Sequence, residues 1–323
     1  MKPLALVTGA TGFIGPRTVL ELLQSGYRVR LTIRRDEQAN KLRRIFNKYD
    51  QRIEFLTVPD ITAEGAFDIA VRDVQYILHV ASPLPGSQDL LTPAVRGTVS
   101  ILESASRIPS VKKVVITASA ASFMPLTSQQ NGSVITETED IPYNIDYKII
   151  SLLDPMTQYR ASKVASYKAV LEFVRDQKPT FDVVTLHPIF VYGRNLVQEK
   201  SDSPSGTCGM LFRSLISEKP LVGQFLGVHV DDVATAHVRA LNTSITGFRS
   251  FLLSATRRSW VEVETFVRRQ YPQLPIKLKA EDWEDYTVDA SKAEKELGLC
   301  FKSMEDQVKD VVDQQLELGK FDM

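Results

Sequence analysis

The chain has 323 residues, of which 43% are hydrophobic and 24% are charged, a globular composition that excludes a disordered, collagen-like or coiled-coil chain. Its 39 basic and 39 acidic residues cancel, so the charge of a nucleic-acid-binding domain or of a polybasic membrane patch is missing. No apolar run approaches the ~20 residues that cross a bilayer. Two cysteines, Cys208 and Cys300, are too few for a disulfide framework and favour a reduced, cytoplasmic protein.

Short apolar runs alternate with longer helical patterns through the first half of the chain. Such runs are typical of βαβ units in a buried parallel sheet. We therefore expect an α/β fold of Rossmann type, a doubly wound parallel sheet with a smaller C-terminal substrate lobe. The predicted strands are Leu4–Thr8, Arg28–Ile33, Ile53–Val58, Tyr76–Val80, Val114–Thr117, Val183–His187 and Ser250–Leu253, and the predicted helices are Pro16–Gln24, Pro93–Arg107 and Thr157–Arg175.

The pattern changes at about Arg194, where a polar stretch, residues 194–207, predicts a mobile loop or lid. Residues 255–288 alternate less clearly. We expect a nucleotide-binding Rossmann domain in 1–193 plus 226–254, and a substrate lobe with the C-terminal helices in 194–225 plus 255–323.

A glycine-rich turn follows the first predicted strand and opens a helix. Its three glycines suit a tight turn, a close backbone approach to a pyrophosphate and close packing of helix on strand. The helix N-terminus would offer free N–H groups to the phosphates. A glycine-rich turn without a ligand is the alternative, which the placement between strand and helix disfavours. The expected cofactor contacts are Thr8, Gly9, Thr11, Gly12, Phe13, Ile14 and Gly15.

Two arginines, Arg34 and Arg35, close the second predicted strand. NAD-binding folds usually carry an acidic residue there for the ribose 2′-hydroxyl, whereas a basic residue suits a 2′-phosphate. The pattern favours NADP over NAD; the alternative is two solvated arginines beside Asp36 and Glu37. After the third strand, Asp60 and Ile61 are candidates for adenine contacts, although Asp60 equally suits a loop cap.

Tyr159 and Lys163 stand four residues apart and share one face if the segment is helical. Lysine beside a phenol favours the phenolate, which makes the tyrosine a proton donor and acceptor near neutral pH. Ser119 follows the carboxyl end of a central strand, where open α/β sheets place their sites, and it could hydrogen-bond a substrate carbonyl oxygen. Ser122 competes for that role, and a plain loop serine is the bland alternative.

These motifs, in this order, resemble the extended short-chain dehydrogenase/reductases over essentially the whole chain, and most of all their NADPH-dependent carbonyl reductases. They are Thr8–Gly15, Val80–Pro83, Thr117–Ala120, Tyr159–Lys163, Pro188–Gly193, His229–Ala234 and Asp289–Gly298. The resemblance implies a catalytic triad of Ser119, Tyr159 and Lys163. It also implies NADP(H) contacts by Tyr159, Lys163, Val80, Ala81, Ser82, Pro188, Ile189 and Val191.

The chain departs from the flavonoid-reducing members of that family at Met124, where they carry an asparagine that binds the flavonoid. Apolar side chains near the expected site suggest a moderately apolar substrate. The candidate substrate pocket consists of Leu84, Phe123, Met124, Phe190 and Met210.

The expected reaction is NADPH-dependent reduction of an aldehyde or ketone to an alcohol. One alternative is a nucleotide-sugar epimerase or dehydratase with bound NAD. Arginine binds diphosphates well, and the arginines that would suit this alternative are Arg194, Arg213, Arg257 and Arg258. The other is a non-enzymatic NADP-binding sensor. We expect a monomer or homodimer with a small carbonyl substrate, no nucleic-acid or membrane partner and no metal, since the four histidines lack ligand spacing.

Overall fold

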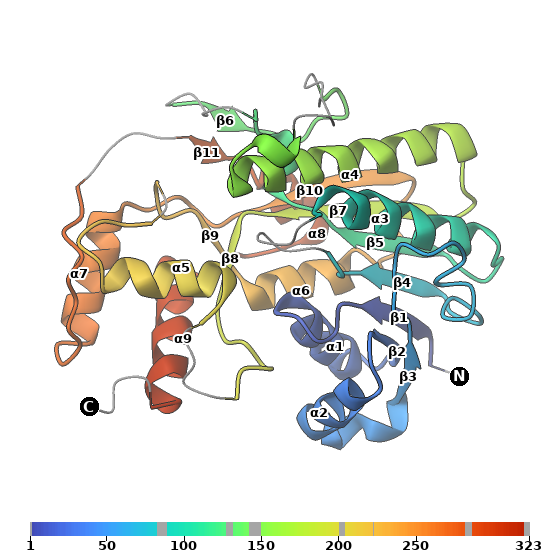
Figure 1. Cartoon of the computed structure of the whole chain (residues 1–323), viewed down its shortest axis with the longest axis horizontal. Coiled ribbons are helices and arrows are strands. Elements are labelled where there is room, and N and C mark those ends of the chain that lie inside the picture. The colour runs from blue at the N-terminus through green and yellow to red at the C-terminus, as the bar shows by residue number, and fades with distance from the viewer. Residues whose placement is uncertain are drawn as a thin grey trace.

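The computed structural model describes residues 2–82, 89–126, 132–141, 150–199, 204–221, 223–281 and 286–319. A seven-stranded sheet in the order β10-β7-β5-β4-β1-β2-β3 forms its centre, and every neighbouring pair is parallel (Figure 1). The predicted Rossmann-type sheet is therefore confirmed. Its strands are β1 (Leu4–Thr8), β2 (Arg28–Ile33), β3 (Ile53–Thr57), β4 (Tyr76–His79), β5 (Lys113–Thr117), β7 (Asp182–Pro188) and β10 (Phe248–Leu253).

Helices cover both faces of this sheet. Helices α1 (Ile14–Gln24) and α6 (Val230–Arg239) pack together on one face, and α3 (Leu91–Ser106) and α4 (Pro155–Gln177) pack together on the other. Strand residues alternate between the two layers, as the pleat requires: Ala5 and Val7 join the cluster with α1 and α6, whereas Leu4 and Leu6 join the cluster with α3 and α4.

A third apolar cluster lies beside the sheet. It is built from α5 (Gly206–Leu215), α7 (Trp260–Gln270), α9 (Met304–Glu317) and Tyr192 at the end of β8 (Phe190–Tyr192), and Figure 1 shows these helices grouped on one side of the molecule. The predicted division into two domains stays a prediction. The remaining elements are β9 (Gly227–His229), which pairs with β8, β6 (Val134–Ile135), which pairs with β11 (Thr287–Val288), and the helices α2 (Glu37–Ile45) and α8 (Ser291–Leu297).

The segment from Arg194 onward carries no helix or strand before α5 begins at Gly206, within the residues described there, 194–199 and 204–205. Asn195 is bonded to α9, because its N–H donates to Gln314 Oε1 (2.9 Å) and its carbonyl accepts from Gln314 Nε2 (2.9 Å). No described helix is both long and apolar enough to span a bilayer.

Candidate active site

The glycine turn sits between β1 and α1 at the carboxyl edge of the sheet. Gly9 has a φ of +74°, and a Cβ there would lie 2.7 Å from the Ala81 nitrogen. A Cβ on Gly15 would lie 2.1 Å from the Gly9 carbonyl oxygen, so the turn can close only with glycine at both places. These two contacts explain the outer glycines of the motif.

The middle of the turn is open. Thr11 and Gly12 are exposed, and a Cβ on Gly12 would meet only the Gly9 carbonyl oxygen, at 3.4 Å, among the described atoms. Helix α1 starts behind it with no side-chain cap and no acidic residue in its first turn. Its free N–H groups and partial positive charge fit the pyrophosphate of a dinucleotide, with Phe13 and Ile14 half-buried beside them.

Thr8 has another role than the expected cofactor contact. It is fully buried, and its hydroxyl oxygen accepts the N–H groups of Val80 (3.1 Å) and Ala81 (3.0 Å). The Thr8 hydroxyl in turn donates a hydrogen bond to His79 Nδ1, 3.0 Å away. Burial lowers the pKa of His79 to about 4, so this ring is neutral. Thr8 thus ties the turn to the end of β4 from inside the protein, and nothing of its hydroxyl is left for a cofactor.

Arg34 and Arg35 stand exposed after β2, and neither forms an ion pair with a described residue. The backbone N–H groups of both arginines donate to Gln38 Oε1, at 2.9 and 3.1 Å, and so fix the turn that carries the two side chains. Asp36 instead accepts a hydrogen bond from Thr57 on β3. The acidic neighbour is thus engaged elsewhere, and two guanidinium groups are available for a 2′-phosphate.

The strand end next to this turn carries Asp60 and Ile61. Asp60 is exposed and accepts from the N–H (2.8 Å) and the hydroxyl (2.7 Å) of Thr62, which lower its pKa, as the nearby Arg34 also does. This is the loop-cap geometry left open by the sequence. Ile61 reaches α3, where a Cβ on Gly97 would lie 2.7 Å from its Cδ1.

Ser119 follows β5 in extended backbone and begins a short 3-10 turn, Ala120–Phe123. Its Oγ accepts the Ala121 N–H at 3.2 Å, which leaves the hydroxyl proton free to be donated. The competing candidate, Ser122, is fully buried and donates to the Lys163 carbonyl at 3.2 Å. Ser122 therefore links the 3-10 turn to α4, whereas Ser119 is 8% exposed and has its hydroxyl proton available.

Helix α4 carries the other two members of the expected triad. Asp154 caps its N-terminus, Pro155 occupies the first turn, and Tyr159 is half-buried one turn further on. Lys163 is 7% exposed; its Nζ lies 5.4 Å from the Tyr159 ring centroid and donates to Ser82 Oγ at 2.7 Å. The lysine thus joins α4 to the segment after β4, where the sequence placed cofactor contacts.

The segment after β7 runs past the same edge. Pro188 ends β7, the N–H of Ile189 donates to the Leu253 carbonyl (3.1 Å), and the Val191 carbonyl accepts from Thr207 on α5. Phe190 is half-buried against the cluster of α5, α7 and α9, and Met210 of α5 is half-buried as well. The two side chains stand on facing elements, as a shared pocket requires.

Two other pocket candidates are taken up by packing. Phe123 (6% exposed) and Met124 (4% exposed) belong to a buried cluster with Ile135 and Val164. The Phe123 ring lies 5.3 Å from that of Tyr167. Sequence reasoning counted both as pocket residues because apolar side chains after a strand look alike whether they face inward or outward. Leu84 lies outside the described residues.

The arginines that suited a diphosphate are partly engaged. Arg194 pairs with Glu317 and Asp310, and Arg258 pairs with Glu262 (2.9 Å). No described group of three His, Cys, Asp or Glu residues gathers as metal ligands would.

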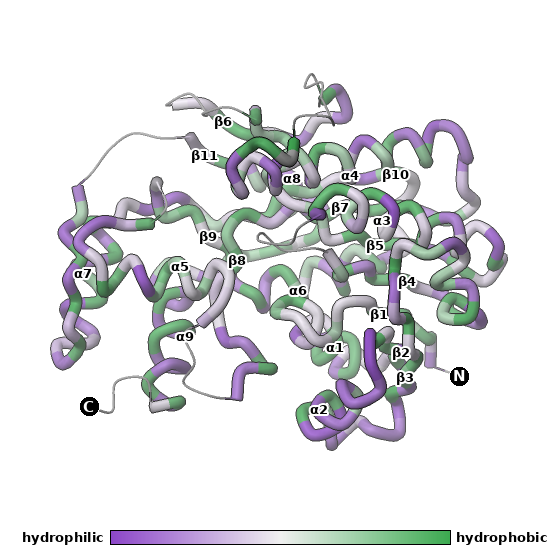
Figure 2. The backbone as a smooth tube through the Cα atoms, viewed as in Figure 1, coloured by the Kyte–Doolittle hydropathy of each residue, from purple (hydrophilic) through white to green (hydrophobic). Residues whose placement is uncertain are grey.

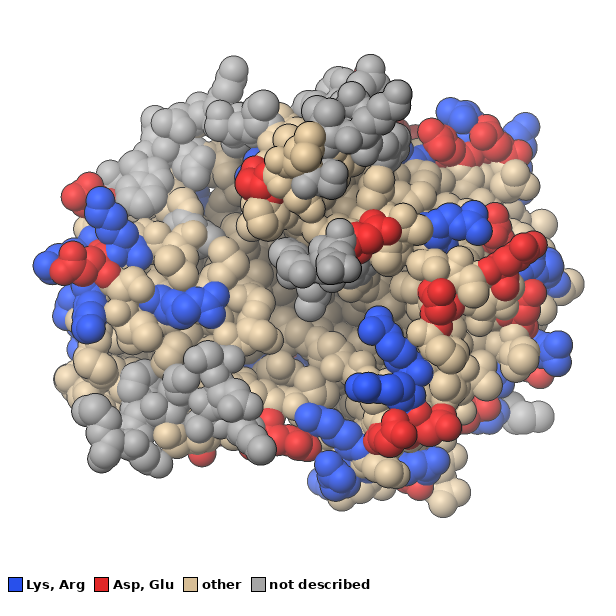
Figure 3. All heavy atoms as spheres, in the orientation of Figure 1, with Lys and Arg blue, Asp and Glu red and all other residues tan. Residues whose placement is uncertain are grey.

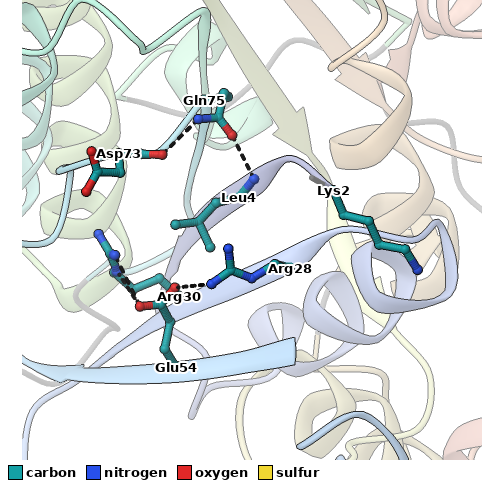
Figure 4. Close-up of a pocket in the computed structure, with 7 residues that line it drawn as sticks. All are labelled: Lys2, Leu4, Arg28, Arg30, Glu54, Asp73 and Gln75. Carbon is teal, nitrogen blue, oxygen red and sulfur yellow. Dashed lines mark hydrogen bonds and ion pairs between the residues drawn. The ribbon is translucent and has the colours of Figure 1, made fainter. Parts of the chain in front are cut away.

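Figure 3 shows a hollow in the face that carries the site, between α5 on one side and α1 and β4 on the other, with Lys and Arg side chains at its rim near α2. Figure 2 shows the chain between β2 and α2 as one of the most hydrophilic stretches of this face. A second hollow of about 450 Å³ lies at the opposite, amino edge of the sheet (Figure 4). Its two arginines are both engaged, since Arg28 (3.4 Å) and Arg30 (3.1 Å) pair with Glu54.

Known proteins share this arrangement over nearly the full chain. The ketoreductase sphI of Aspergillus fumigatus is 39% identical over 330 aligned residues, covering 98% of this chain and 98% of the relative. A putative NADPH-dependent methylglyoxal reductase, GRP2, of Candida albicans is 30% identical, covering 95% and 97%. The crystal structure of the yeast methylglyoxal/isovaleraldehyde reductase Gre2 complexed with NADPH matches with a TM-score of 0.87 and 26% identity, covering 98% of this chain and 100% of that chain.

The family profile described as NAD dependent epimerase/dehydratase family matches residues 5–251. With the glycine turn, the parallel sheet and the Tyr159–Lys163 pair of α4 in one structure, the chain belongs to that family, as one of its extended short-chain dehydrogenase/reductases.

Proposed function

We propose that this protein reduces a moderately apolar aldehyde or ketone to the alcohol with NADPH, and that Ser119, Tyr159 and Lys163 act on the reacting groups. The activity class and the cofactor predicted from the sequence are confirmed by the ketoreductase relative and by the NADPH-bound neighbour. The protein is an NADP-dependent oxidoreductase.

The observation that carries the residue roles is the way α4 and the turn after β5 are joined. Ser122 bonds the Lys163 carbonyl (3.2 Å), and Lys163 Nζ bonds Ser82 (2.7 Å). One ammonium group therefore stands between Tyr159 and the segment after β4. This supports a site in which the tyrosine, the lysine and Ser119 share one substrate.

Each residue has a distinct task in the proposed reaction. When bound, NADPH supplies the hydride for the carbonyl carbon. Tyr159 donates a proton to the developing alkoxide, and Ser119 donates a hydrogen bond to the same oxygen, as an oxyanion donor does. Lys163 keeps two of its three N–H donors beyond the hydrogen bond to Ser82, which suits a ribose hydroxyl.

The cofactor preference rests on Arg34 and Arg35, which are exposed and form no ion pair with the described residues. The substrate preference rests on Phe190 and Met210, half-buried on facing elements. Two free cysteines, one buried and one exposed, agree with the cytoplasm as the proposed compartment. A monomer or homodimer without nucleic-acid or membrane partners stays a prediction.

Substitution of Tyr159 by phenylalanine tests the proposal. We expect kcat with a panel of aldehydes, α-dicarbonyls and aryl ketones to fall about 10²–10⁴-fold, the usual size of positioned acid catalysis. NADPH binding, followed by cofactor fluorescence, should persist. Tyr27→Phe is the matched control, because Tyr27 packs on Tyr76 (ring centroids 5.8 Å apart) before β2 begins, and it should keep full activity.

Two results would contradict the proposal. One is a Tyr159→Phe enzyme with most of its activity. The other is a wild-type protein that turns over no carbonyl and retains NAD through purification, which would favour the nucleotide-sugar alternative.

A further inference from the structure

His187, on β7, is buried behind the site and has a partner at each ring nitrogen. Its Nδ1 lies 3.0 Å from the Ser119 carbonyl oxygen, and its Nε2 lies 2.9 Å from Thr185 Oγ1. A carbonyl oxygen can only accept, so Nδ1 carries a proton and donates it. Burial lowers the pKa of His187 to about 3, so the ring is neutral, and Nε2 is an acceptor.

The ring is held on its other sides as well. Phe123 lies 4.4 Å from it and Tyr167 4.9 Å, centroid to centroid. Thr185 Oγ1 lies 2.9 Å from Ser250 Oγ, which in turn lies 2.9 Å from the Tyr167 hydroxyl. A chain of buried polar groups thus runs from α4 through β10 and β7 to the backbone of Ser119, and buried networks of this kind are rigid when every member is satisfied.

Ser119 needs such support because β5 has already ended. The last sheet bond on this side is from the Ala118 N–H to the Leu186 carbonyl (2.7 Å). Beyond it, the Ser119 carbonyl accepts from the Ser122 N–H (2.9 Å) within its own turn and from His187 across the sheet. The hydrogen bond from His187 therefore ties the backbone of this turn to the neighbouring strand, and the packing of Phe123 on the same ring adds to it.

We propose that His187 is a positioning residue: by donating to the Ser119 carbonyl, it sets the direction in which the Ser119 hydroxyl meets the carbonyl oxygen of the substrate. The inference rests on the proposed function, since it acts through Ser119. A misplaced oxyanion donor lowers the rate of the chemical step and leaves cofactor binding intact.

Two amide substitutions separate the two ring nitrogens. Asparagine places its amide near Nδ1 and keeps a donor for Ser119, whereas glutamine reaches the Nε2 position and leaves the Ser119 carbonyl without that donor. We expect His187→Asn to keep kcat within about threefold and His187→Gln to lose about 10–100-fold, with KM and Kd for NADPH unchanged in both.

His237→Gln is the matched control. His237 is equally buried and has the same kinds of partners, the Val233 carbonyl (2.7 Å) and Thr117 Oγ1 (2.7 Å), but it holds Thr117 and not Ser119. Its kcat should stay within about threefold of wild type, whatever stability it loses.

The Ser119→Ala background distinguishes the two proposals. If His187 acts through Ser119, His187→Gln adds no further loss of kcat to Ser119→Ala. Equal kcat for His187→Gln, His187→Asn and His237→Gln would overturn the positioning role, as would a full additional loss in the Ser119→Ala background. A Ser119→Ala enzyme with wild-type kcat would instead overturn the proposed role of Ser119 and, with it, this inference.

Discussion

At the amino end of β2, Arg28 and Arg30 pair with Glu54, and the Arg30 guanidinium also donates to the carbonyls of Ala70 (2.8 Å) and Arg72 (2.6 Å). At the carboxyl end of the same strand, Arg34 and Arg35 are exposed and form no ion pair within the described chain. Arginine side chains thus have partners within the protein at one edge of the sheet and are available to a ligand at the other. What marks a binding edge is the absence of internal partners together with open backbone N–H groups, and not positive charge.

The largest predicted effect is the loss of folding stability at low pH, which we trace to groups at the carboxyl edge of the sheet. Three buried histidines near the carboxyl edge have lowered pKa values, because burial lowers the pKa of His79 and His237 to about 4 and that of His187 to about 3. The unfolded chain, with histidine near 6.5, takes up protons that the folded protein does not, so stability falls as the pH drops below about 6.5. Three protons correspond to a slope of about 4 kcal/mol per pH unit near pH 5.

Urea unfolding between pH 7.5 and 5 measures this slope. His237→Asn should reduce it by about one third, because one of the three titrating rings is gone. An unchanged slope in that variant, or a urea midpoint that does not move with pH, would show that protonation of these rings does not cause the loss of stability.

The glycine turn is the second difference between the edges. Gly15→Ala puts a Cβ 2.1 Å from the Gly9 carbonyl oxygen, a backbone atom that cannot move aside, so we expect a loss of about 1–3 kcal/mol in the free energy of unfolding and loss of NADPH binding. Gly12→Ala meets only one described atom, at 3.4 Å. It should keep the stability and lose affinity for NADPH, because its methyl group occupies the space for the pyrophosphate. Equal melting temperatures for the two variants would contradict the packing argument.

The arginines themselves provide the finest test. Replacing Arg34 and Arg35 together by serine should raise KM for NADPH about 100-fold or more and leave KM for NADH unchanged, since each charge-assisted hydrogen bond contributes about 1.5–3 kcal/mol. Arg28→Ser, at the other end of β2, should leave both constants unchanged. An NADPH KM that responds equally to both changes would mean that long-range charge, and not a 2′-phosphate contact, determines the preference.

The strands were predictable where sequence and burial agree. The predicted limits of β1 and β2 are those observed, because each apolar run is bounded by turn residues. β5 begins one residue earlier than predicted, at Lys113. A lysine marks a surface position in a sequence, but the Lys113 ammonium is buried and donates to the carbonyls of Asn242 (2.6 Å) and Ile245 (2.5 Å), which lie far along the chain.

The helices of the third apolar cluster were harder to predict, although their first turns carry a sequence signal. Helix α7 was missed because residues 255–288 show weak alternation, yet Ser259 and Glu262 form a capping box at its start, a spacing that is visible in sequence. Ser303 and Asp306 do the same for α9. The pairing of β6 with β11 joins residues about 150 positions apart, and no local pattern encodes it.

The expected triad came from motifs, but the support beneath it did not. Ser122, His79 and His187 stand in the sequence as an ordinary serine and two isolated histidines. Their roles depend on partners from other parts of the chain, such as the Lys163 carbonyl for Ser122 and the Ser119 carbonyl for His187. Short motifs predict what touches a ligand, and tertiary contacts decide what holds those residues in place.

The third apolar cluster has a consequence for synthesis on the ribosome. Five strands, β1 to β5, lie within residues 4–117, so this part of the sheet can assemble early, whereas β7 can join it only after residue 188 has been made and β10 only after residue 253. The cluster around Tyr192 needs Met304, Val308 and Val312 of α9, so its apolar surface stays uncovered until α9 has been made. Apolar surface that is exposed in this way makes a folding intermediate prone to aggregate, and the packing of α9 ends that exposure.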